Sequence, residues 1–156
     1  MAQTTALLFA IVAALLSAPT PVPLADPPGP VPVLENVDLM DLMLRPAYDE
    51  LQRAMAAPPA DRLAWAALYQ KAARLAETEN LLFFRTRAGE ARQTEWLERA
   101  AQARAASAEV AAAALLGLRR ARTEDFEAVR HAFPAVSAGC TACHRAFTRE
   151  APVIKP

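Results

Sequence analysis

Three residues near the end of the sequence have the types and spacing of an attachment site for a prosthetic group. They are Cys140, Cys143 and His144, within the segment CTACH. On a helix, positions i, i+3 and i+4 share one face, so both thiols and the imidazole would point the same way. Two such thiols can form thioethers with the vinyl groups of one porphyrin, and the imidazole can bind its iron. The segment therefore predicts one covalently attached haem c, with His144 as the iron ligand.

Two other chemistries use the same residue types. A redox-active C-x-x-C dithiol typically lies at a helix N-terminus in a βαβ setting, whereas this pair lies near the C-terminal end of a helical pattern. A zinc site would also need His131, which is about 14 Å from Cys140 along a continuous helix. One zinc ion cannot span that distance, so the haem-free dithiol is the alternative that stays open.

The composition favours an all-α fold for the elements that position these residues. The 156 residues suit one domain, and 17 Lys and Arg balance 17 Asp and Glu, which gives no basic footprint for nucleic acid. Alanine, the best helix former, occurs 38 times, and there are only four glycines. Alanine buries little area, so a haem would add apolar bulk that this core lacks.

The beginning of the sequence predicts export. Residues 5–18 are an uncharged apolar run of signal-peptide length, shorter than the roughly 20 residues of a membrane span. Residues 19–35 are proline-rich and favour an extended tether. We therefore expect residues 1–18 to be an export signal or an uncleaved anchor, and the domain that follows to be periplasmic, where haem c is attached.

Four helical stretches follow the tether, at about residues 36–57, 61–84, 90–118 and 124–148, with a tail at 151–156. They predict an antiparallel four-helix bundle over residues 36–150. Asn36 and Thr123 are the expected N-caps, Gly89 marks a break, and Pro46 and Pro134 are expected to bend their helices. The expected inner faces are Met40, Met43, Ala47, Leu51 and Ala54; Trp65, Leu68, Ala72 and Leu75; Trp96, Ala100, Ala103, Ser107, Val110 and Ala114; and Phe126, Val129, Phe133, Val136, Cys140, Cys143 and Phe147.

The sequence resembles the class II c-type cytochromes, which include the cytochromes c prime. The resemblance rests on CTACH near the C-terminal end, preceded by DFEAVRHAFPAVSAG and followed by RAF, and on Met40 with Pro46 in LMDLMLRPAYDEL. It implies a periplasmic four-helix bundle with a single haem, often a homodimer. The family usually has Arg or Lys four residues after the haem histidine, where this chain has Thr148 followed by Arg149. Arg45 is a candidate for contact with a haem propionate.

The ligand on the opposite side of the iron decides the expected function. A methionine thioether there would suit one-electron transfer with periplasmic redox partner proteins, and an apolar face would suit the binding of small gases. Met40 is the first choice from its spacing to Pro46, Met43 the second and Met55 a distant third. His131 lies off the helical stripe and is not expected to bind the iron. No constellation of general acid, base or nucleophile is present, so we do not expect an enzyme.

Overall fold

The computed structural model describes residues 31–85, 92–148 and 153–156. The predicted export signal, most of the predicted tether, Gly89 and Arg149 lie outside these residues. Within them the chain forms helices and no strand, in the order α2 (Asn36–Leu39), η1 (Met40–Leu44), α3 (Arg45–Ala54), α4 (Arg62–Glu79), η2 (Asn80–Phe84), α5 (Gln93–Arg120), η4 (Thr123–Asp125) and α6 (Phe126–Phe147).

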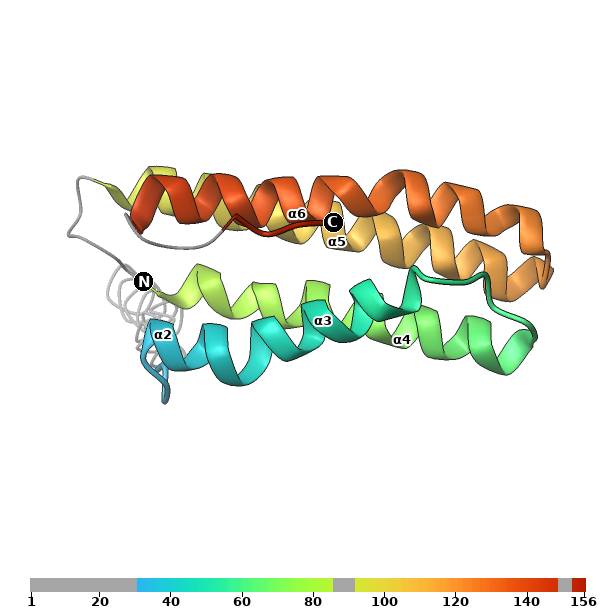
Figure 1. The fold of residues 1–156 in the computed structure, drawn as a ribbon. Coiled ribbons are helices and arrows are strands. Elements are labelled where there is room, and N and C mark those ends of the chain that lie inside the picture. Colours follow the sequence, from blue (N-terminus) through green and yellow to red (C-terminus); the bar gives the residue numbers. More distant parts are fainter. Residues whose placement is uncertain (1–30, 86–91, 149–152) are drawn as a thin grey trace, which may run out of the picture.

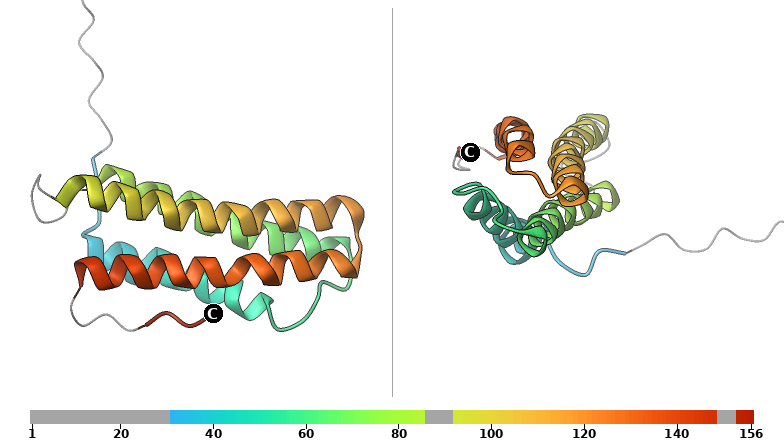
Figure 2. Two further views of the ribbon diagram at one scale, coloured as in Figure 1. Left: turned by 90° about the horizontal axis from the view of Figure 1, so that it is seen from above. Right: turned by 90° about the vertical axis from the view of Figure 1, so that its right-hand side faces the viewer.

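These elements make the predicted antiparallel four-helix bundle, in which α2, η1 and α3 together form the first helix (Figures 1 and 2). In Figure 1, α2 begins and α6 ends at the same end of the bundle. The predicted inner faces of the second and third helices are confirmed, since every residue named for them is buried. None of the described helices has the length and apolar character needed to cross a membrane.

The first helix differs from the expectation because it contains a π turn, η1, just before Pro46. The Arg45 amide donates to the carbonyl of Met40, five residues back, and the wider turn brings Leu39 and Leu44 to the core together. Proline cannot donate a backbone hydrogen bond and its ring crowds the carbonyl four residues earlier, so a local widening at this point is understandable. The inward face predicted through Met43 is therefore wrong, because Met43 is 40% exposed.

The predicted helix ends also need correction. Glu35 is the N-cap of α2, so Asn36 is already the first helical residue. Thr123 begins the 3-10 turn η4 and does not cap α6, whose N-cap is Asp125. Such short tight turns commonly precede α-helices and displace the cap along the chain. The first helix ends at Ala54, earlier than predicted, whereas Pro134 lies inside α6 with helix on both sides.

Two glycines allow the last three helices to pack closely. A Cβ at Gly117 of α5 would collide with the indole of Trp65 on α4. A Cβ at Gly139 of α6 would lie 3.3 Å from the Cα of Ala103 on α5. These contacts fix which residues of α4, α5 and α6 lie at the same level of the bundle.

The seam between α3 and α6 is open by comparison. No Cα atom of α3 comes within 8 Å of one of α6, whereas α5 packs along both α4 and α6. The rings of Tyr48 and Phe133 stack across this seam with centroids 5.7 Å apart. The tail segment, residues 153–156, also lies here, as the views of its position beside α6 and α3 show (Figures 1 and 2).

Hydrogen bonds hold the tail segment to both helices. The Ile154 amide donates to the hydroxyl of Thr141 at 3.1 Å, and Gln52 Nε2 donates to the carbonyl of Lys155 at 3.1 Å. The hydroxyl of Tyr48 donates to the same carbonyl. The tail that the sequence leaves without a role is thus joined to Thr141 of the CTACH segment and to α3.

Replacing Thr141 with valine should loosen the tail segment while keeping the shape of the side chain. We expect faster amide hydrogen exchange at Ile154 and a loss of about 1 kcal/mol in the free energy of unfolding, the usual net contribution of one hydrogen bond. Thr94→Val, at an exposed position of α5, is the matched control. Unchanged exchange at Ile154 would contradict the role given to Thr141.

Candidate functional site

The three residues of the predicted attachment site lie on the last two turns of α6. Cys143 is buried, and Cys140 and His144 are half-buried. Both cysteines are present as thiols. Cys140 packs against the core together with Phe147, so the predicted stripe continues to the end of the helix. The structure therefore brings two thiols and an imidazole to one partly buried face, the donor set that a covalent haem requires.

Aromatic side chains from α5 and α6 line the end of the bundle beside this face. The ring of Trp96 meets Phe147 edge-on with centroids 5.1 Å apart, and its indole N–H donates to the carbonyl of Leu82 at 2.8 Å. Arg92 also contacts Phe147: its guanidinium lies over the ring, 4.5 Å from the centroid, and donates to the carbonyl of Ala146. Phe147, three residues after His144, is thus held from two directions.

The acidity of Cys140 bears on the dithiol alternative. Burial, together with the nearby charges of Glu79 and Cys143, raises the pKa of Cys140 to about 12. Redox-active dithiols depend on a lowered cysteine pKa, because the thiolate is the reactive form. A thiol that stays protonated at neutral pH does not fit that chemistry.

The first helix places one methionine opposite the end of α6. Tyr48 lies close to Ser137 of α6, and Met40 precedes Tyr48 by eight residues, about 12 Å along the helix. Because the two helices are antiparallel, this brings Met40 to about the level of His144, seven residues after Ser137. Met40 is half-buried and packs against the core, whereas Met43 faces outward.

A buried acid on α4 is a feature that the sequence reasoning missed. Glu79 is only 2% exposed and follows Trp65, Leu68, Ala72 and Leu75 on the same helical stripe. That stripe was the signal that could have revealed it, since the next inward position after Leu75 is residue 79. The acidic sequence around it is instead typical of a solvated helix end.

A buried cation lies at the same end of the bundle as His144. Arg85, which follows η2, is buried; it donates through Nη1 to the carbonyl of Leu34 and, at 3.3 Å, to Oδ1 of Asn36. Its Nε is buried without a hydrogen-bond partner, and no carboxylate of the described residues forms an ion pair with it. A buried guanidinium without a counter-charge is costly, so this position suits a carboxylate from a bound group.

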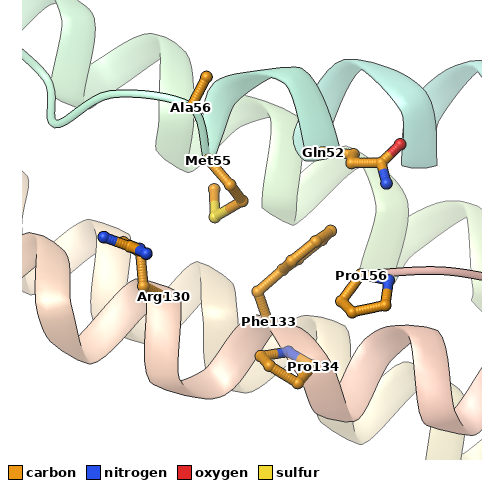
Figure 3. A pocket seen from close by; sticks show the side chains of 7 residues that line it. All are labelled: Gln52, Met55, Ala56, Arg130, Phe133, Pro134 and Pro156. Carbon is orange, nitrogen blue, oxygen red and sulfur yellow. The ribbon is translucent and has the colours of Figure 1, made fainter.

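A pocket of about 330 Å3 lies farther along the open seam (Figure 3). Phe133 reaches into it from α6 toward α3, and Arg130 stands at its side. Its lining consists of Gln52, Met55, Ala56, Arg130, Phe133, Pro134 and Pro156. Pro134 precedes Cys140 by six residues, about 9 Å along α6. The pocket therefore continues the seam but is not the face that carries the thiols.

The remaining candidates from the sequence are placed away from the three attachment residues. His131 is exposed, and no cluster of metal-binding side chains occurs among the described residues. Met55 lines the pocket near Phe133, toward the other end of the seam. Arg45 is exposed and forms an ion pair with Asp41 at 2.6 Å.

Fold and site together define a class of protein, because a helical bundle with a partly buried Cys-x-x-Cys-His face fits a haem protein. A family model described as cytochrome C' matches residues 35–148, nearly three quarters of the sequence. The chain belongs to the cytochrome c′ family and is a haem c-type cytochrome. The comparisons with curated proteins and with solved structures gave no match.

Proposed function

We propose that this protein is an exported cytochrome that carries single electrons between periplasmic partner proteins and is not an enzyme. One haem c would be attached through Cys140 and Cys143, with His144 as the proximal ligand and Met40 as the distal ligand. The observation that carries the proposal is the half-buried Met40 on the π turn, at the level of His144. When bound, the haem supplies an iron that accepts and releases one electron.

The chain's own residues account for holding such a group. The two thiols of α6 would hold the haem through thioether bonds, and His144 lies one turn beyond Cys140 on the same face. Trp96 and Phe147 give an apolar wall that excludes water. Arg85, whose Nε is buried without a partner in the described residues, would bind a propionate, and we favour it over Arg45, which is already paired at the surface.

The position of the π turn η1, at about the level of His144, favours electron transfer over the binding of gases. π turns within α-helices are frequent at functional sites, because they re-aim side chains that a regular helix would place elsewhere. In this π turn Met43 is exposed, whereas Met40 packs against the core. A thioether ligand raises the reduction potential and leaves no open position for a gas.

Spectra of the purified protein test this proposal. After maturation in a host that attaches haem c, we expect a coloured protein with the mass of the chain plus one haem, and neither cysteine open to alkylation. The reduced form should give a low-spin spectrum. A high-spin, five-coordinate spectrum would instead establish the gas-binding alternative, and a colourless protein with two reactive thiols would overturn haem attachment.

A further inference from the structure

Glu79 is a carboxylic acid in the core that the proposed electron transfer does not use. Its Oε2 atom is buried and has no hydrogen-bond partner among the described residues, and the same holds for Oγ of Ser107. Burying such a group costs free energy unless it is paired or neutral. A carboxylic acid at 2% exposure is therefore favoured in its protonated form, or with a group that binds its oxygen.

The helix contacts place Glu79 at the level of Cys140. Glu79 follows Trp65 by fourteen residues on α4, and Ala103 precedes Gly117 by fourteen residues on the antiparallel α5. Since Trp65 meets Gly117 and Ala103 meets Gly139, one layer of the bundle contains Glu79, Ala103 and the start of the CTACH segment. The charge of Glu79 accordingly acts on the thiol of Cys140. His144 lies one turn beyond this layer.

Glu79 can bind and release a proton near neutral pH. Burial raises its pKa to about 7, while the nearby Ser107 hydroxyl, which lies outside hydrogen-bond geometry, and Arg104 oppose the rise. The other charged or titratable groups at this end of the bundle include Arg85, buried after η2 without an ion-pair partner in the described part of the chain, and the half-buried imidazole of His144. Arg104 is exposed, the thiol of Cys140 would be consumed by the thioether, and Asp41 and Arg45 of the first helix pair with each other at the surface.

We propose that Glu79 is a proton-binding site coupled to the oxidation state of the haem iron. When one electron from a redox partner reduces ferric to ferrous iron, Glu79 takes one proton from solvent at its carboxylate; oxidation releases both. This inference rests on the proposed function, because it needs haem at Cys140. The physical reason is charge: the ferric iron with the porphyrin ring, counted without the propionates, would have one positive charge that favours the carboxylate, and reduction would remove it.

The pKa of Glu79 is lower with oxidised than with reduced haem, so the midpoint potential falls as pH rises between the two values and is constant outside them. A tenfold difference in proton affinity between the two states corresponds to a total change of about 59 mV.

The experiment is a titration of midpoint potential against pH on the haem-loaded protein. In Glu79→Gln, a neutral isostere, we expect this dependence to vanish and the potential to stay near the low-pH value of the wild type. Glu77→Gln, an exposed neighbour on α4, should keep the wild-type curve. Ser107→Ala should move the curve to higher pH, since the Ser107 hydroxyl lowers the pKa of Glu79.

A second measurement on the wild type keeps the inference testable if Glu79→Gln fails to fold. Redox-difference infrared spectra should show the carbonyl stretch of one buried protonated carboxylic acid appearing on reduction. A haem-loaded protein whose midpoint potential does not vary with pH would overturn this inference alone. The same holds if the pH dependence is unchanged in Glu79→Gln, or if that infrared band is absent. Colourless wild-type protein would overturn the proposed function as well.

Discussion

Replacing His144 with alanine is expected to leave the haem tethered and to abolish the native ligation of its iron. The attachment would depend on Cys140 and Cys143, which the substitution leaves in place on the same face of α6. The mass should therefore still include one haem, while the visible spectrum changes in both oxidation states. Because axial ligands set haem potentials over about 0.8 V, we expect the midpoint potential to move by on the order of 100 mV or more.

The control for this experiment is His131→Ala, the only other histidine of the sequence. His131 is exposed on the outer side of α6, so its replacement should leave spectrum and potential unchanged. Added imidazole should restore much of the native spectrum in His144→Ala by occupying the position of the lost side chain. A His144→Ala protein with an unaltered spectrum would remove the residue from the proximal position.

The fold could be predicted where the apolar pattern has the period of a regular helix. The stripe from Phe126 to Phe147 alternates steps of three and four, and the structure buries or half-buries all of it. The first helix could not be predicted in this way, because Leu39 and Leu44 are five residues apart and reach the core together only through the π turn. Pro46 indicated a disturbance, but not that an extra residue would be inserted before it.

The candidate site was predictable to the extent that it rests on one contiguous motif. Cys140, Cys143 and His144 follow from spacing alone, whereas Glu79 and Arg85 reach this end of the bundle only through the packing of segments distant in sequence. The tail segment shows the same limit. Its contacts with Thr141 and Tyr48 join residues far apart in the sequence, which no helical period relates.

Replacing Met40 with leucine should convert a low-spin cytochrome to a high-spin one. Leucine keeps nearly the volume of methionine, so packing against the core should change by less than about 1.5 kcal/mol. It has no thioether, so the iron would lose its distal ligand and become open to carbon monoxide. Because a methionine ligand raises the potential, we expect the midpoint potential to fall by on the order of 100 mV.

The Met43→Leu variant tests which of the two methionines of the π turn binds the iron. Met43 is 40% exposed, so its replacement should leave the spectrum low-spin. If Met43→Leu gives the high-spin form and Met40→Leu does not, the π turn must rearrange when haem binds, because its present geometry turns Met43 away from the core. If neither substitution matters and the wild type is already high-spin, the open distal face would favour gas binding over electron transfer.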